Sequence, residues 1–201
     1  MAPIVPDPKR IRSFRDAGAF EAWLRANHDR ADEIWLRVYK KGSVVPSIDC
    51  AQALDVVLCW GWSDGIRKSY DAQSFLQRYT PRRPKSIWSQ INRDHVARLI
   101  KAGRMTEHGQ RQVDLAKADG RWDAAYAPIR SIRTVPPDLE QAIHKNKKAL
   151  ETFRTLSRAN VFALTFRTNN MKTAAGREKK IKDLVAMLAR GETIVPQKRK
   201  S

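Results

Sequence analysis

The sequence predicts an α+β fold, in which an N-terminal module of helices around a small antiparallel sheet precedes a C-terminal module of helices. Residues 33–41 are rich in aromatic and β-branched side chains, which is typical of a strand. Residues 62–70 and 74–80 are expected to form two further strands joined by a short turn. After residue 137 apolar side chains recur at helical spacing, so the rest of the chain is expected to be helical.

The helices of the N-terminal module are predicted from residues that favour helix ends. Asp, Ser or Thr just before a helix accepts hydrogen bonds from its free backbone N–H groups, and Gly commonly ends a helix. Helices are therefore expected to begin after Asp16, Asp49, Ser86 and Thr106, and the last three to end at Gly61, Gly103 and Gly120. Because proline cannot donate to a β-ladder, Pro81 and Pro84 are expected to end the sheet.

The chain is expected to contain two modules, a linker and two tails. Residues 1–12, Pro-rich and basic, are predicted to form a flexible tail. The predicted segments that follow are the α+β module at 13–126, the linker at 127–137, the helical module at 138–196 and a basic tail at 197–201. Within the helical module, helices are expected at 138–145, 148–157, 161–166 and 177–190.

The protein is strongly basic, with a formal charge of +18 over 201 residues and a pI of about 10.4. Such an excess favours anionic partners, namely nucleic acid, an acidic lipid surface, or phosphorylated or carboxylated small molecules, although it is also compatible with a merely solvated surface. The charge is concentrated in two places. From Arg78 to Arg104, eight Lys and Arg residues accompany Asp94 alone, and the last predicted helix and the C-terminal tail are also basic.

The two cysteines, Cys50 and Cys59, are expected to be free thiols on opposite faces of one helix. Nine helical residues rise by about 13.5 Å, whereas a disulfide needs Cα atoms within about 7 Å. Free thiols indicate a reducing compartment. The sequence shows neither an apolar run typical of a signal peptide nor one long enough to span a membrane, so we expect a cytoplasmic protein.

Residues 78–92, RYTPRRPKSIWSQIN, predict an anion-binding site. Arg82, Arg83 and Lys85 precede a helix expected to begin after Ser86, and a helix N-terminus offers free N–H groups and partial positive charge. The prolines restrict the loop and so reduce the entropy lost on binding. The candidate residues of this site are Trp62, Asp64, Arg78, Arg82, Arg83, Lys85, Ser86, Trp88 and Ser89.

Each part of this site has a structural alternative. Arg82 or Arg83 could form an internal ion pair with Asp64 or Asp71 of the preceding hairpin, which is a common use of such residues. Trp60 and Trp62, which flank Gly61, could form a wall of the pocket or could simply be buried in the core.

A second hypothesis is binding of nucleic acid across the two basic clusters, which would need an extended basic face and not a concave pocket. The candidate residues for it are Arg93, Arg98, Lys101, Arg104, Arg177, Lys179, Lys180 and Lys182. The four histidines show no metal-ligand spacing, and the sequence contains no Gly-rich phosphate loop, HExxH or GxSxG. We therefore predict no catalytic residue, metal or cofactor, and an enzyme stays the third and least supported hypothesis.

Four motifs in order resemble the bacterial YdeI/OmpD-associated family, also called bacteriocin-protection or OmdA-like proteins. They are GWSDG at 61–65, RYTPRRPKSIWSQIN at 78–92, KADGRWDAAY at 117–126 and VAMLARGE at 185–192. The resemblance runs from about Ser13 to Pro196. The sequence departs from the family pattern at Trp60 and Ser63, where Phe and Ile are usual, and at Thr173–Arg177, where only Arg177 matches a Pro-Glu-Thr-Arg step.

This resemblance implies an α+β part followed by a helical part. The family's names imply a role in tolerance of bacteriocins, antimicrobial peptides or envelope stress, and association with an outer-membrane porin. Direct capture of a cationic peptide does not fit a chain of charge +18, because like charges repel.

Overall fold

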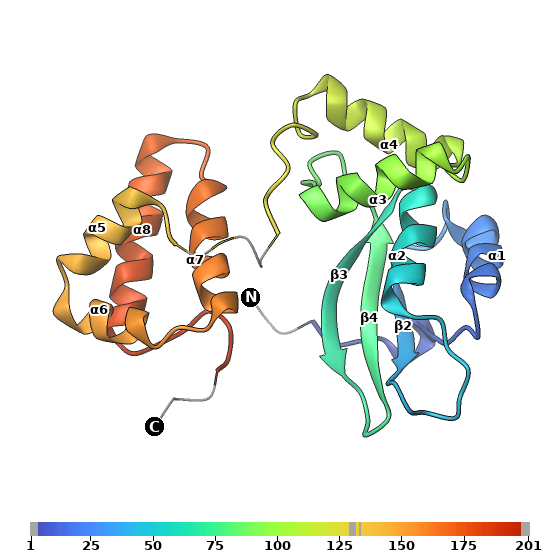
Figure 1. The fold of residues 1–201 in the computed structure, drawn as a ribbon, viewed down its shortest axis with the longest axis horizontal. Helices are drawn as coiled ribbons and strands as arrows, with labels where there is room; N and C mark the ends of the chain where they lie inside the picture. Colours follow the sequence, from blue (N-terminus) through green and yellow to red (C-terminus); the bar gives the residue numbers. More distant parts are fainter. Residues whose placement is uncertain (1–3, 129–131, 133, 198–201) are drawn as a thin grey trace. The chain divides into compact units, whose positions relative to one another are not determined.

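The computed structural model describes residues 4–128, 132 and 134–197, and the chain divides into two compact units, 1–125 and 126–201 (Figure 1). The N-terminal unit combines a four-stranded sheet with helices, and the C-terminal unit contains helices in its described residues. The chain is therefore α+β, as predicted.

The sheet of the N-terminal unit has the strand order β1-β2-β4-β3. Its strands are β1 (Ile11–Arg12), β2 (Ile34–Tyr39), β3 (Trp62–Ser69) and β4 (Ser74–Pro81). β4 pairs antiparallel with both β2 and β3, whereas β1 pairs parallel with β2. The β3–β4 turn is fixed by Asp71, whose carboxylate accepts hydrogen bonds from the backbone N–H groups of Gln73 and Ser74.

Residues 8–12, which were predicted to belong to a flexible tail, form a 3-10 helix (Pro8–Arg10) and the strand β1. Because β1 pairs parallel with β2, the sheet is mixed and not purely antiparallel. A strand of two residues has no alternating pattern of its own, which is why the sequence did not reveal it. Residues 1–3 of the predicted tail lie outside the described residues.

Helix α2 occupies the centre of this unit, where it packs against α1, β3, α3 and α4. The α-helices in the described part of this unit are α1 (Ala17–Asn27), α2 (Cys50–Cys59), α3 (Gln90–Lys101) and α4 (Glu107–Ala118). As predicted, Asp16, Asp49 and Thr106 cap α1, α2 and α4. The core joins helices and sheet through buried side chains such as Phe20, Leu24, Leu36, Val57, Leu58, Leu99 and Val113.

Both cysteines are free, as predicted, and they are the first and last residues of α2. Burial raises the pKa of the Cys50 thiol, and it raises that of Cys59 to about 11. Neither group is therefore activated as a nucleophile, and both are best understood as packing residues.

The C-terminal unit consists of α5 (Pro137–His144), α6 (Lys147–Arg154), α7 (Arg158–Asn169) and α8 (Ala174–Ala189). α8 packs against the other three helices, around a core that includes Leu139, Ile143, Leu164, Leu184 and Leu188. All four predicted helices are present. The predicted α7, 161–166, was too short because its N-cap is Ser157 and its last turn, near Thr168, is polar.

The boundaries of the helical unit lie partly inside the predicted linker and tail. Val135, placed in the linker, is buried in the helical core, and Thr134 accepts a hydrogen bond from Thr165. Gln197, placed in the C-terminal tail, accepts hydrogen bonds from Ser157 and Asn160. Residues 129–131 and 133 of the linker and 198–201 of the tail lie outside the described residues.

In the described part of the chain, no helix combines the length and the apolar character needed to cross a membrane.

Candidate functional site

The predicted anion site begins at Arg78, which is an ion-paired residue of the sheet. Its guanidinium Nε donates to Glu33 Oε2 at 2.6 Å, and Glu33 is largely buried. Arg10 lies 3.7 Å from the same carboxylate, and Trp35 Nε1 donates to it at 3.2 Å. The charge of Arg78 is therefore used to neutralise Glu33 within the fold.

Arg82 is buried, with only 7% of its surface exposed. Its guanidinium carbon lies 3.5 Å from the ring centroid of Trp88, and its Nη1 donates to the carbonyl of Ile87 at 3.2 Å. Its backbone N–H donates to Gly61 at 3.0 Å. A cation that lies over an indole ring and is removed from water contributes substantially to stability. Arg82 therefore stabilises this part of the fold.

Ser86 does not begin a helix, contrary to the prediction. Its backbone N–H donates to the Arg83 carbonyl and its Oγ accepts from the Arg83 N–H, which closes a β-turn over residues 83–86. Proline favours the second position of such a turn, which Pro84 occupies. α3 begins at Gln90, and Ser89 caps it by accepting from Asn92 N–H at 3.1 Å. The helix N-terminus predicted at residues 87–89 is therefore absent.

Just after the turn, Trp88 forms a pair with another tryptophan, Trp122. Trp88, 2% exposed, meets Trp122 edge to face with ring centroids 4.9 Å apart. Arg93 lies 5.2 Å and Lys117 5.6 Å from the centroid of Trp122, and Arg93 also donates to the Trp122 carbonyl. We name Arg82, Trp88, Arg93, Lys117, Arg121 and Trp122 the tryptophan cluster.

Arg121 ties this cluster to the turn. Its Nη1 donates to the carbonyl of Ser86 at 2.8 Å, while its Nε is paired with Asp119 at 2.7 Å. Neither Arg121 nor Trp122 was predicted as a site residue, although both lie in the motif at 117–126. The motif could have indicated that these residues matter. However, nothing in the neighbouring sequence showed that they would contact Ser86 and Trp88, more than thirty positions earlier.

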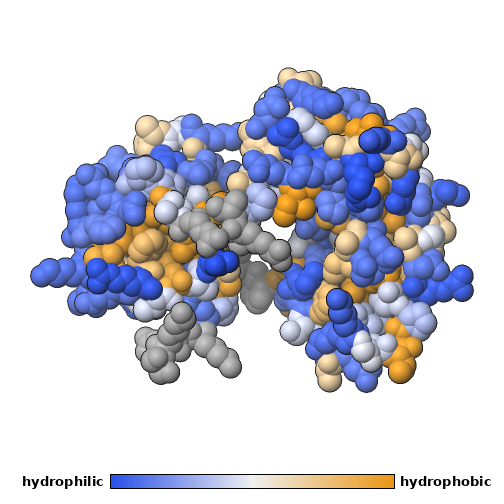
Figure 2. All heavy atoms as spheres, in the orientation of Figure 1, coloured by the Kyte–Doolittle hydropathy of each residue, from blue (hydrophilic) through white to orange (hydrophobic). Residues whose placement is uncertain are grey.

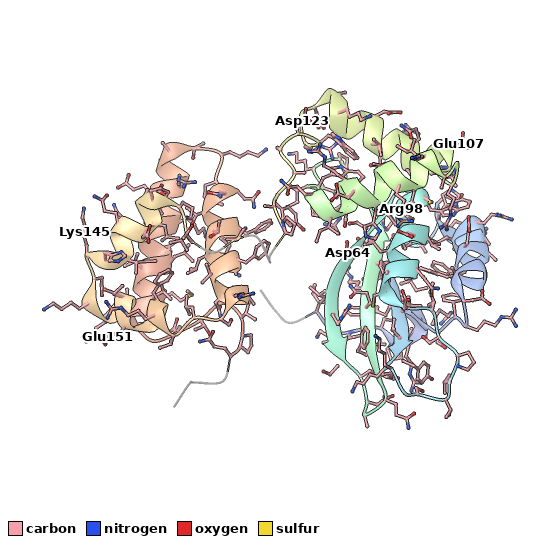
Figure 3. All side chains as sticks on the ribbon, viewed as in Figure 1. Asp64, Arg98, Glu107, Asp123, Lys145 and Glu151 are labelled. Carbon is pink, nitrogen blue, oxygen red and sulfur yellow. The ribbon has the colours of Figure 1, made fainter. Side chains whose placement is uncertain are left out.

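Of the predicted cations near the turn, Arg83 and Lys85 have exposed side chains. Asp64, also exposed, accepts a hydrogen bond from Asn92 Nδ2 at 3.3 Å, and Asp71 forms an ion pair with Arg37 at 2.7 Å. The turn therefore presents two cations to solvent, and Arg121 of the tryptophan cluster hydrogen-bonds to its last residue, Ser86. Asp64 is labelled in Figure 3.

Trp62 and Trp60 belong to the core. Trp62 is 1% exposed, donates to the His28 carbonyl at 3.3 Å and meets Trp23 edge to face. Trp60 stacks on His108 with ring centroids 5.6 Å apart. The structural alternative considered for these tryptophans is therefore the correct one, and Trp62 is not a wall of an open pocket.

In the first basic cluster of the nucleic-acid hypothesis, Arg98 (labelled in Figure 3) is already paired. Its Nη2 donates to both carboxylate oxygens of Asp55, at 2.6 and 2.7 Å, and His95 lies 2.6 Å from the same group. Burial raises the pKa of Asp55, but the hydrogen bonds from Arg98 and His95 outweigh it, so the pKa lies below its usual value. This group joins α2 to α3. Lys101 and Arg104, at the end of α3, are exposed.

In the second basic cluster, too, some of the cations are ion-paired and others, in the described part of the chain, are not. Arg177 donates to both oxygens of Asp138 and to the Thr168 carbonyl, and its guanidinium holds the pKa of Asp138 below its usual value. Lys182 pairs with Glu178 at 2.9 Å. Lys179 is exposed and Lys180 half-buried on α8. Arg177, the one residue of its step that matches the family pattern, thus joins α5, α7 and α8.

Among the residues that the structure describes, no group of three or more His, Cys, Asp or Glu side chains could hold a metal ion.

Two family models match the chain. Residues 133–191 match the family described as Bacteriocin-protection, YdeI or OmpD-Associated (OmdA), which confirms the suspected family for the helical unit. Residues 12–112, half of the chain, match a domain of unknown function, DUF8412. No curated protein and no solved structure matches the chain.

These matches divide the resemblance that was expected to run from about residue 13 to 196. The motifs at 61–65 and 78–92 fall in the DUF8412 match, and the motif at 117–126 lies in neither. The chain belongs to the DUF8412 family and carries an OmdA domain at residues 133–191.

Proposed function

We propose that the protein is a cytoplasmic, non-enzymatic binding protein whose N-terminal unit binds an anionic group through Arg83 and Lys85. The observation that carries the proposal is that both cations are exposed on a turn whose backbone is held by hydrogen bonds. The turn is closed by the hydrogen bonds between Arg83 and Ser86, and it is anchored through Arg121. The description of the OmdA family supports a place in bacteriocin or antimicrobial tolerance.

The turn suits a phosphate or carboxylate for two physical reasons. A rigid turn loses little entropy on binding, and Pro84 adds to that rigidity. The guanidinium of Arg83 offers a planar fork that can donate two parallel hydrogen bonds to such a group. Arg82, Arg93 and Lys117 lie close to the rings of Trp88 and Trp122, so they add positive charge to this part of the unit.

The double variant Arg83→Ala, Lys85→Ala is expected to weaken binding of inorganic phosphate about 100-fold, because it removes two charged hydrogen-bond donors that contribute roughly tenfold each. The measurement is the rise in melting temperature of the full chain on adding phosphate or sulfate, since a ligand of the native state stabilises it. The matched control is Lys101→Ala, Arg104→Ala, which removes the same charge from exposed positions at the end of α3. An equal loss of the phosphate effect in both variants contradicts a localised site.

A second candidate function, binding of nucleic acid, is favoured by the charge of the helical unit. Residues 126–201 contain 17 Lys and Arg against 6 Asp and Glu, so most of the chain's excess charge belongs to this unit. Such binding would neutralise phosphates and release counterions, which makes affinity fall steeply as salt rises.

For this candidate, gel shifts on unrelated duplexes are expected to show similar affinities at low salt. Replacing Lys179 and Lys180 by Ala should reduce the slope of log affinity against log salt by about 2, close to one unit for each phosphate that is no longer neutralised. The variant Lys101→Ala, Arg104→Ala shows in the same assay whether the N-terminal cluster takes part. Absence of binding at low salt, or a sequence preference that survives high salt, contradicts this function.

A further inference from the structure

The loop between β2 and α2 presents Val44, which is 95% exposed and is the most exposed of the large apolar residues that the structure describes. Val45 follows it at 39% exposed, and Tyr70, 50% exposed, lies on the neighbouring β3–β4 turn. Figure 2 shows hydrophobic residues beside hydrophilic ones at the end of the unit where this loop lies in Figure 1. Transfer of these exposed apolar side chains from water into an apolar environment would be favourable, so the loop is suited to a partner that offers one.

The exposure of Val44 is built into the loop. At its start, the Lys40 backbone N–H donates to Gln73 and its Nζ donates to the Ala72 carbonyl, both at 2.8 Å. At its end, Ile48 is fully buried and its N–H donates to Phe14. Gly42, with φ of +92°, reverses the chain between these two anchors. The valines are therefore held away from the core by a loop that is attached at both ends.

The same end of the sheet is positively charged. Lys40, Lys41 and Lys68 lie there, on the loop and near the end of β3. The carboxylate of Asp71 is paired with Arg37, and that of Asp49 caps α2. Arg37 also lies 5.1 Å from the centroid of the Tyr70 ring, so this exposed tyrosine lies next to a cation.

We propose that this end of the N-terminal unit docks on an anionic lipid bilayer. Val44 and Val45 would enter the interface between headgroups and acyl chains, while Lys40, Lys41 and Lys68 meet the lipid phosphates and carboxylates. Tyr70 suits the headgroup level, where an aromatic ring with a polar end is favoured. Apolar residues surrounded by lysines match such a surface in both chemistry and charge.

Charge and chemistry argue against other partners for this surface. A second copy of this chain would bring two bodies of charge +18 together. Nucleic acid would satisfy the lysines but offers Val44 no apolar environment. A small anion could enter the cavity of about 320 Å³ between the loop and the β3–β4 turn, but it would leave the valines in water.

The test is co-sedimentation of the full chain with vesicles of phosphatidylcholine, alone and with phosphatidylserine added. Only the anionic vesicles should bind it. Val44→Ser should weaken that binding about tenfold through reduced apolar burial. Lys41→Gln should weaken it about fivefold, because each basic residue near an anionic surface contributes about that factor. Since both side chains are exposed, neither change should alter the melting temperature.

Matched controls are Ile100→Ser and Lys101→Gln, an exposed apolar residue and an exposed lysine at the end of α3. The proposal requires them to leave vesicle binding unchanged. If they weaken it as much as the loop variants, the attraction is that of the whole charged protein and the proposal fails. It also fails if Val44→Ser weakens binding to duplex DNA equally, or if it converts a dimer to a monomer in light scattering.

Discussion

Gly109→Ala is expected to lower the free energy of unfolding by about 3 kcal/mol, because it forces overpacking between two backbones. Gly109 is buried in the first turn of α4, where that helix crosses the last turn of α2. A Cβ at this position would overlap the carbonyl oxygen of Cys59 and would lie 2.7 Å from that of Leu58. Both obstacles are backbone atoms, so no side-chain rotation can relieve the overlap.

The two helices cannot easily move apart, because other bonds hold them at this distance. Thr106 donates to the Cys59 carbonyl through its backbone N–H and through its Oγ1. Gly61, just after α2, approaches the same turn, and a Cβ there would lie 2.8 Å from the His108 carbonyl. Two glycines therefore permit the close approach of the first turn of α4 to the end of α2.

The measurement is chemical denaturation of the full chain, with Gly18→Ala as the control. Gly18 is also helical, but a Cβ there would meet only the Asp16 side chain, at 3.4 Å. This control should leave stability unchanged or raise it by up to about 1 kcal/mol, since alanine is the better helix former. Similar stability changes at the two positions would show that α2 and α4 can separate at little cost.

The parts of the fold that the sequence predicted correctly depend on local chemistry. Asp16, Asp49 and Thr106 lie where a side-chain oxygen can reach N–H groups two or three residues ahead, and each caps a helix. The hairpin of β3 and β4 is local in the same sense. β1 was missed because its two residues are a strand only through pairing with β2, more than twenty positions later.

The start of α3 shows where local reasoning reaches its limit. Ser86 and Ser89 are equally good caps by composition, and the choice between them depends on burial. Trp88 is buried against Trp122 and Arg82 lies on Trp88, so residues 83–88 form a turn and an extended approach to the helix. These interactions join residues 82–88 to Trp122, which lies more than thirty positions later. For the same reason the sequence could suggest a cationic site here but could not show that Arg82 is buried on Trp88 whereas Arg83 and Lys85 are exposed.

Arg82→Ala is therefore expected to destabilise the N-terminal unit by about 3 kcal/mol, while Arg83→Ala changes stability by less than about 0.5 kcal/mol. Removing Arg82 forfeits the stacking on Trp88, worth about 2 kcal/mol for a desolvated pair, and the hydrogen bond to Ile87, worth about 1 kcal/mol. Trp88 would also lose its cover and the β-turn its support.

Urea denaturation followed by tryptophan fluorescence measures both variants, and Arg82→Lys separates charge from shape. Lysine keeps the charge but cannot lie flat on an indole, so Arg82→Lys should recover only part of the lost stability. If Arg82→Ala were as stable as the wild type and simply abolished the stabilisation by phosphate, Arg82 would be a ligand-binding residue. The structural role assigned to it would then be wrong. If Arg83→Ala were the more destabilising of the two, the exposed turn would be structural, and the proposed anion site would lose its main support.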